Sequence, residues 1–137
     1  PGKVTNARYE TPVSQVSLLP TLLELADIPS RSEMDMPSLA ESFMGQKTPR
    51  KQPIFGEYNR FYGQLYPVRM VVDGVWKYVH YFGPEGELFD LSNDPGEMNN
   101  LVNSSSHEDE LVRMQLLLAD WMRKSGDVFE MEKRFQL

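Results

Sequence analysis

Residues 68–82 (VRMVVDGVWKYVHYF) form the most constraining pattern in this sequence, because two β-prone runs flank the dipeptide Asp73-Gly74. β-Branched and aromatic residues are typical of strands, and Asp-Gly tolerates the positive φ angles of a two-residue type I′ turn. The pattern therefore predicts a β-hairpin. With the turn at Asp73 and Gly74, Val72 lies opposite Val75.

The same hairpin predicts which side chains share a face. With the turn at Asp73 and Gly74, Met70 lies opposite Lys77 and Val68 lies opposite Val79. Side chains alternate between the faces of a strand. The opposite face then carries Arg69, Val71, Trp76 and Tyr78.

Two further strands and a helix complete the predicted C-terminal part. Residues 54–58 and 87–90 are short strand candidates, so the expected sheet is antiparallel with about four strands. Residues 108–124 predict a helix with one apolar stripe. The stripe comprises Leu111, Met114, Leu117, Leu118, Trp121 and Met122. Ser105 and Glu108 have capping-box spacing, and Gly126 is placed to end the helix. We expect an α+β fold in which this helix packs on the hairpin face.

A second helix is predicted near the N-terminus, over residues 14–26. Its apolar residues recur at helical spacing, Ser14 or Ser17 can cap it, and it should end before Pro29. Residues 29–53 contain four prolines around a short helical candidate at 38–44, which is typical of a connecting stretch. The expected organisation is therefore an N-terminal part, 1–53, and a sheet-plus-helix part, 54–137.

Composition narrows the functional classes. A chain of 137 residues can bury one modest core, and its formal charge of -6 gives it no general attraction for nucleic acid or anionic lipid. No cysteine is present, which excludes a disulfide framework, a thiolate zinc site and a thiol nucleophile. The apolar runs are too short for a membrane span.

The metal-site patterns in the sequence fail on inspection. Asp90, Ser92 and Asp94 alternate as calcium ligands would, but Pro95 occupies the place of the required glycine and Leu101 that of the bidentate glutamate. The two histidines lie on different predicted elements without a third ligand, so we expect no zinc site. We interpret His80 as a half-buried strand residue.

Residues 56–66 (GEYNRFYGQLY) are the candidate ligand-contact segment, placed between two predicted strands. Exposed aromatic rings beside a guanidinium can stack on a flat ring or sugar face while binding an anion. The alternative is that these rings pack on the sheet and the stem of Arg60 covers them.

Five stretches together resemble the C-terminal part of a sulfatase of the arylsulfatase type, in the alkaline-phosphatase-like superfamily. They are residues 1–4 (PGKV), 12–29 (PVSQVSLLPTLLELADIP), 54–58 (IFGEY), 68–79 (VRMVVDGVWKYV) and 87–101 (ELFDLSNDPGEMNNL). Ser17 departs from the Asp usual in the family, and both residues are interpreted as helix caps. Asp27 stands where the family commonly has glycine.

The resemblance implies a sulfuric ester hydrolase whose catalytic parts lie elsewhere. Sulfatases use a formylglycine, made from a C/S-x-P-x-R motif, beside a calcium ion, and the resemblance places both in a missing N-terminal domain. Residues 27–31 (DIPSR) match only the Pro and Arg of that motif, because Asp27 cannot become an aldehyde. We therefore expect no catalytic residue and no metal ligand in this segment, which should be inactive alone.

The implied role is to close one side of the parent enzyme's substrate cleft. Tyr58, Asn59 and Arg60 are the candidate substrate-binding residues. The implied partner is the catalytic domain, and the implied substrate is a sulfate ester, with carbohydrate sulfates among the candidate classes. The implied N-terminal helix belongs to the catalytic domain, and exposed apolar surface around Leu18, Leu22 and Leu25 predicts a homodimer. The resemblance also implies a periplasmic, secreted or lysosomal parent.

A free-standing carbohydrate- or protein-binding module and a phosphoesterase or phosphonate hydrolase remain as alternatives.

Overall fold

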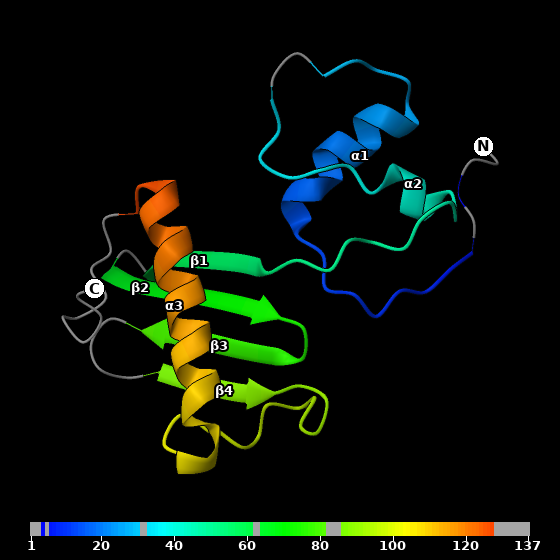
Figure 1. The fold of residues 1–137 in the computed structure, drawn as a ribbon. Helices are drawn as coiled ribbons and strands as arrows, with labels where there is room; N and C mark the ends of the chain where they lie inside the picture. Colours follow the sequence, from blue (N-terminus) through cyan, green and yellow to red (C-terminus); the bar gives the residue numbers. More distant parts are fainter. Residues whose placement is uncertain (1–3, 5, 31–32, 62–63, 82–85, 128–137) are drawn as a thin grey trace. The chain divides into compact units, whose positions relative to one another are not determined.

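A computed structural model of the chain describes residue 4 and residues 6–30, 33–61, 64–81 and 86–127, without the side chains of residues 60–66. The chain divides into two compact units, residues 1–52 and residues 53–137 (Figure 1). In the part of the chain described, no helix combines the length and apolar character needed to cross a membrane.

The second unit contains a four-stranded antiparallel sheet. Its strands are β1 (Ile54–Phe61), β2 (Gln64–Asp73), β3 (Trp76–Tyr81) and β4 (Gly86–Asp90). They lie side by side in chain order, so each strand pairs with the next one along the sequence. The predicted antiparallel sheet of about four strands is confirmed.

The predicted hairpin forms, but its predicted register is wrong by two residues. Val72 lies opposite Lys77 instead of Val75, and the pairs farther along the hairpin shift in the same way. The reason is that the turn consists of Gly74 and Val75. Gly74 alone takes a positive φ there, 61°, which matches a turn with glycine at its first central position.

The predicted division of side chains between the two faces is confirmed. A slip of one residue would exchange the faces, whereas a slip of two leaves them unchanged. Val71 lies opposite Tyr78 in the observed register, and Arg69 and Trp76 fall on the same face by alternation.

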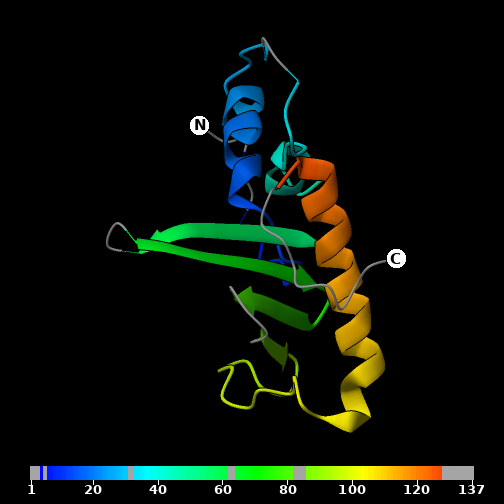
Figure 2. The same cartoon turned by 90° about the vertical axis from the view of Figure 1, so that its left-hand side faces the viewer.

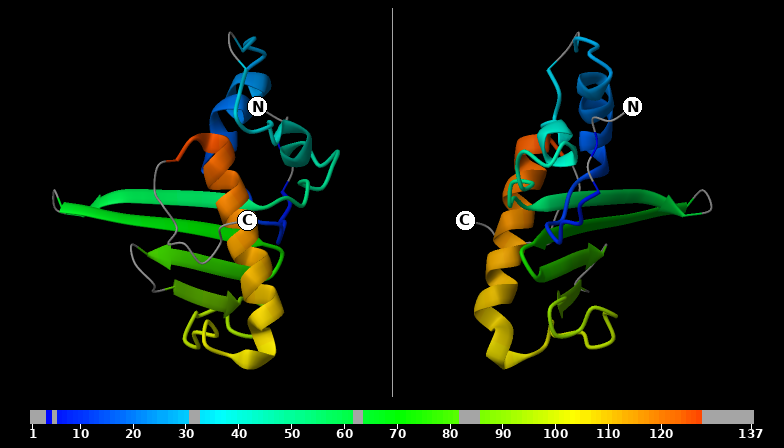
Figure 3. Two further views of the ribbon diagram at one scale, coloured as in Figure 1. Left: turned by 60° about the vertical axis from the view of Figure 1, so that its left-hand side comes forward. Right: turned by 90° about the vertical axis from the view of Figure 1, so that its right-hand side faces the viewer.

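The helix α3 (Glu108–Ser125) covers that face of the sheet, as the predicted packing of the helix on the hairpin requires, and it crosses the strands (Figures 2 and 3). The buried core joins three sheet residues to three helix residues. These are Val71, Tyr78 and Leu88 from the sheet, and Met114, Leu118 and Met122 from the helix. The rings of Phe55 and Trp121 stack beside this core, with their centroids 4.9 Å apart. The apolar stripe of α3 and its packing surface were therefore predicted correctly.

The two ends of α3 show one wrong and one confirmed prediction. His107 precedes the helix without a side-chain capping bond, and Ser105 lies in the short 3₁₀ helix η2 (Ser105–His107), so the predicted capping box does not form. Acidic residues in the first turn still complement the helix dipole. Gly126 ends the helix in the left-handed conformation, as predicted, with φ 70°.

The first unit contains the 3₁₀ helix η1 (Gln15–Ser17), α1 (Leu18–Leu25) and the short α2 (Ala40–Phe43). The oxygen of Ser14 accepts a hydrogen bond from the backbone N–H of Val16, which confirms its capping role. Ser17 makes no such bond, so its interpretation as a cap is wrong. Instead, Ser17 is buried.

Candidate functional site

The candidate residues Tyr58, Asn59 and Arg60 lie within strand β1. The sequence pattern placed residues 56–66 as a segment between two strands, but β1 continues through Phe61 and β2 begins at Gln64. This prediction is wrong because backbone pairing between β1 and β2 extends through these residues and keeps them in the sheet.

The pairing of these two strands shifts beside Asn59. Tyr58 pairs with Val68, and Arg60 pairs with Leu65, so β2 has one more residue than β1 in this interval. Pro67 lies in the interval and has no N–H to donate to a strand ladder, which explains why the irregularity occurs here. Bulges of this kind bend a strand and redirect its side chains.

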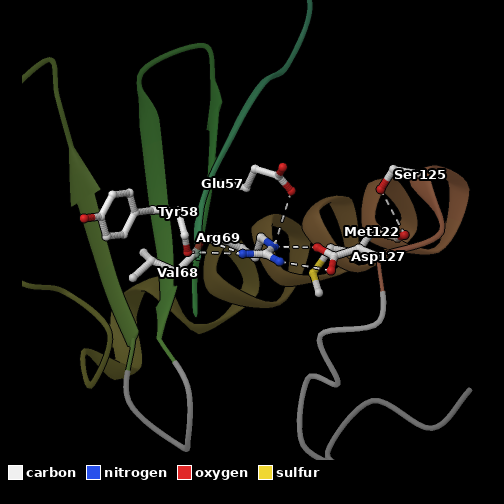
Figure 4. Close-up of polar contacts among 7 residues, drawn as sticks. All are labelled: Glu57, Tyr58, Val68, Arg69, Met122, Ser125 and Asp127. Carbon is white, nitrogen blue, oxygen red and sulfur yellow. Dashed lines mark hydrogen bonds and ion pairs between the residues drawn. The ribbon is translucent and has the colours of Figure 1, made fainter. Parts of the chain in front are cut away.

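The side chains of Tyr58 and Asn59 are exposed, and Tyr58 retains 50% of its accessible surface. The ring of Tyr58 points away from α3, on the opposite side of the sheet from the guanidinium of Arg69 (Figure 4). The side chain of Arg60 and those of the neighbouring aromatics Phe61, Tyr62 and Tyr66 lie outside the described residues. Among the side chains that the structure describes here, Tyr58 therefore offers a free aromatic surface.

Arg69 belongs to β2, the strand that pairs with this part of β1, and it is only 3% exposed. Its Nε and Nη2 atoms donate to the two carboxylate oxygens of Asp127, just beyond the end of α3 (Figure 4). Its Nη1 atom donates to the backbone carbonyls of Tyr58 and Val68, at 3.4 and 3.0 Å. The carboxylate of Glu57 lies 4.0 Å from Nε.

This arrangement stabilises the charged guanidinium. The hydrogen bonding of the guanidinium to Asp127 raises the pKa of Arg69 more than burial lowers it. Charge-assisted bonds in a bidentate geometry are also the strong ones. Arg69 therefore ties the backbone of β1 at Tyr58 to the C-terminal end of α3.

Sequence reasoning placed Arg69 on the same hairpin face as Val71 and Tyr78, but it did not identify its partner Asp127. The signal was present, because a charged residue among core-facing positions requires a counter-ion. The partner lies 58 residues farther along the chain, where no pattern in the sequence marked it.

The acidic turn after β4 has internal hydrogen bonds. The carboxylate of Asp90 accepts bonds from the side chains and backbone N–H groups of Ser92 and Asn93. These bonds lower the pKa of Asp90, and the bond from the Ser92 hydroxyl makes the largest contribution. Within the described ranges, no group of three or more His, Cys, Asp or Glu residues is placed to hold a metal ion.

His80 is more buried than predicted, with 7% of its surface exposed on β3. Its Nδ1 atom lies 3.3 Å from the hydroxyl of Tyr78, which also accepts a bond from Gln115. Burial raises the pKa of Tyr78. This cluster lies under α3 and away from the exposed ring of Tyr58.

Comparison with known proteins matches residues 1–124 to a family model described as N-sulphoglucosamine sulphohydrolase, C-terminal. The uncharacterized sulfatase YidJ of Escherichia coli is 35% identical over 89% of this chain and 24% of its own length. A Delta 4,5-hexuronate-2-O-sulfatase of Bacteroides thetaiotaomicron is 36% identical over 82% of this chain and 24% of its own length.

Solved structures give a similar result. The structure of a 2-O GAG sulfatase superposes with a TM-score of 0.72 at 34% identity, covering 81% of this chain and 25% of that protein. The chain thus spans about a quarter of the length of the relatives it matches.

Proposed function

Because the chain belongs to the family of N-sulphoglucosamine sulphohydrolase C-terminal domains, we propose that it is the non-catalytic C-terminal part of a sulfatase and closes one side of its substrate cleft. The observation that carries this proposal is the match of residues 1–124 to a C-terminal domain within relatives about four times as long. The alternative of a free-standing binding module is tested below.

Sulfate ester hydrolysis in this family uses a formylglycine and a calcium ion, and the proposal places both outside this segment. The 137 residues contain no cysteine and no S-x-P-x-R motif from which the aldehyde could form. Among the described residues, the acidic side chains form no metal-binding group. The part of the reaction left to this segment is to bind and orient the substrate.

The proposed contact surface is Tyr58, Asn59 and Arg60 on β1. An exposed tyrosine ring can stack on the apolar face of a sugar, the amide of Asn59 can bond a hydroxyl, and a guanidinium binds a carboxylate or sulfate bidentately. Arg69 supports this surface from the opposite side of the sheet, because its guanidinium donates a hydrogen bond to the backbone carbonyl of Tyr58. The pairing shift beside Asn59 is a strand irregularity of the kind that often occurs next to functional sites.

The proposed substrate is a sulfated carbohydrate. The family description names a sulphoglucosamine, and relatives are named for a hexuronate 2-O-sulfate and for 2-O sulfated glycosaminoglycan. Sugars present both the flat face that suits Tyr58 and the anionic groups that suit Arg60.

The first test asks whether this segment can hydrolyse a sulfate ester without the rest of the enzyme. The purified 137-residue chain should not hydrolyse 4-nitrophenyl sulfate, whereas the chain extended upstream through its own reading frame should. Turnover by the short chain would contradict the proposal. A reading frame that begins near residue 1 would instead support the free-standing module, and hydrolysis of a phosphonate ester in preference to the sulfate would support the phosphonate hydrolase.

The second test addresses the contact surface in the extended protein. The substitutions Tyr58→Ala and Arg60→Met should each raise KM for a sulfated disaccharide about tenfold, the loss of one contact of about 1.4 kcal/mol, and change kcat little. The control is Glu24→Gln, which replaces an exposed carboxylate in the first unit. Unchanged KM values in both contact variants would remove these residues from the substrate site.

A further inference from the structure

The backbone at the C-terminal end of α3 fixes the position of Asp127. The N–H of Asp127 donates to the carbonyl of Met122 at 3.0 Å. The N–H of Gly126, the left-handed residue that ends the helix, donates to the carbonyl of Arg123 at 3.4 Å. These two bonds form a Schellman motif. The main chain of Asp127 is therefore held by the helix, and its side chain is buried against the sheet, with 8% of its surface exposed.

The carboxylate of Asp127 orients the guanidinium of Arg69. Two nitrogens of Arg69, Nε and Nη2, donate to its two oxygens, so one partner holds one edge of the planar group (Figure 4). A bidentate pair restricts the plane of a guanidinium, whereas a single charge contact would leave it free to turn. The direction of the third nitrogen, Nη1, is therefore set by Asp127.

The Nη1 atom of Arg69 binds the backbone where the pairing of β1 and β2 changes. It donates to the carbonyls of Val68 and Tyr58, which form the last pair before the pairing shift. The pairs between β2 and β3 also end at Val68, opposite Tyr81, so the described residues of β2 beyond this point pair with β1 alone. A two-stranded ribbon is only marginally stable by itself. Arg69 thus anchors the base of this ribbon.

The proposed contact surface begins at the same anchor. The carbonyl of Tyr58 belongs to the peptide group that joins Tyr58 to Asn59, and a peptide group is planar. A hydrogen bond to its oxygen therefore limits the rotation of the backbone on both sides of this peptide. Because the two side chains are attached on either side of it, their directions depend on how this one peptide is held.

Stability alone does not account for a buried ion pair at this position. The neighbours of Arg69 on this face of β2 and β3 include Val71 and Tyr78, which belong to the apolar core. Replacing a buried ion pair with well-packed apolar side chains is often neutral or stabilising. An apolar side chain, however, has no donor for the carbonyls of Tyr58 and Val68. The feature that requires an arginine here is the grip on the backbone of the ribbon.

We propose that Asp127 is a positioning residue for substrate binding, because it orients Arg69 to hold the peptide that follows Tyr58. The inference rests on the proposed function, which supplies the contact surface on β1. It adds that substrate affinity depends on a buried carboxylate at the end of α3, on the other side of the sheet from the exposed ring of Tyr58 (Figure 4).

The test is made in the protein extended upstream through its reading frame, with a sulfated disaccharide as substrate. Below the unfolding transition of the variant, Asp127→Asn should raise KM about fivefold and leave kcat nearly unchanged. The expected rise is smaller than that of Tyr58→Ala, because the ring is misplaced and not removed. The control is Asp120→Asn, which removes a half-exposed carboxylate on the same helix and should leave KM unchanged. An unchanged KM in Asp127→Asn overturns the proposal.

A second variant separates positioning from stability. Arg69→Met/Asp127→Leu removes both buried charges, so the thermal midpoint should recover most of what Asp127→Asn loses. Its KM should stay raised about fivefold, because no side chain at position 69 then donates to the carbonyl of Tyr58. A KM that returns to the wild-type value together with the midpoint overturns the proposal, since the ion pair would then act through stability alone.

A double-mutant cycle tests whether Asp127 acts through Tyr58. Independent residues change KM by factors that multiply, whereas residues in one chain of contacts do not. The KM of Tyr58→Ala/Asp127→Asn should therefore lie below the product of the two single effects, and a full product overturns the proposal.

The same measurements distinguish the failure of this proposal from that of the contact surface. If KM rises in Tyr58→Ala but not in Asp127→Asn, the positioning role is wrong and the contact surface stands. If KM is unchanged in Tyr58→Ala and in Arg60→Met, the contact surface itself is wrong, and the positioning role falls with it.

Discussion

The substitution Asp127→Asn should destabilise the sheet-plus-helix unit strongly, because it removes the counter-ion of a buried guanidinium. Arg69 is 3% exposed and the side chain of Asp127 is 8% exposed. Removing one partner of a buried ion pair typically costs about 3–5 kcal/mol, since the other charge is left uncompensated. We expect about 3 kcal/mol, at the lower end. Arg69 keeps its bonds to the carbonyls of Tyr58 and Val68, and the Glu57 carboxylate remains 4.0 Å away.

The measurement is urea unfolding of the 137-residue chain followed by tryptophan fluorescence. Both tryptophans of the chain, Trp76 and Trp121, lie in the sheet-plus-helix unit, so the signal reports this unit. A loss of about 3 kcal/mol corresponds to a fall in thermal midpoint of about 12 °C or more for a unit of this size.

Two controls separate the buried ion pair from the loss of any carboxylate. Asp120→Asn removes a half-exposed carboxylate on α3 that is paired with Arg123 and Lys124, and it should leave the unfolding midpoint nearly unchanged. Arg69→Met/Asp127→Leu removes both buried charges and should recover most of the stability that Asp127→Asn loses. A loss below about 1 kcal/mol for Asp127→Asn, or an equal loss in the double variant, would refute the reasoning.

Three further changes test the core, the helix end and the pH response. Leu118→Ala, at a fully buried position, should cost about 3 kcal/mol of unfolding free energy by urea titration, and an m-value equal to wild type would confirm that the fold is kept. Gly126→Ala should cost about 1 kcal/mol from the positive φ alone, because nothing lies within 4 Å of the added Cβ, and a neutral result would contradict this. Burial raises the pKa of Tyr78, so its contribution to stability is complete below its ordinary pKa near 10 and is lost as the pH rises through the folded value. Tyr78→Phe should therefore show less loss of stability than wild type between pH 9 and pH 11, and parallel pH curves would exclude this tyrosine as the cause.

The types of residue in the sequence identified the proposed contact surface. The structure showed that this surface lies on a strand. Aromatic residues around an arginine drew attention to residues 56–66 as a loop. Strand β1 instead runs through them to Phe61, because backbone pairing with β2 overrides the weak strand propensity of Asn59. The substrate-contact role of Tyr58, Asn59 and Arg60 stays a prediction.

Local periodicity in the sequence was enough to determine the antiparallel sheet, the faces of its central hairpin and the apolar stripe of α3. These features follow from side-chain repeats of two in a strand and 3.6 in a helix, which neighbouring residues display without help from distant ones. Only the tertiary structure decided the hairpin register and the pairing of Arg69 with Asp127. A register depends on which residue of a turn takes a positive φ, and an ion pair depends on two segments that are distant in sequence. Neither of these is a property of a short stretch of sequence.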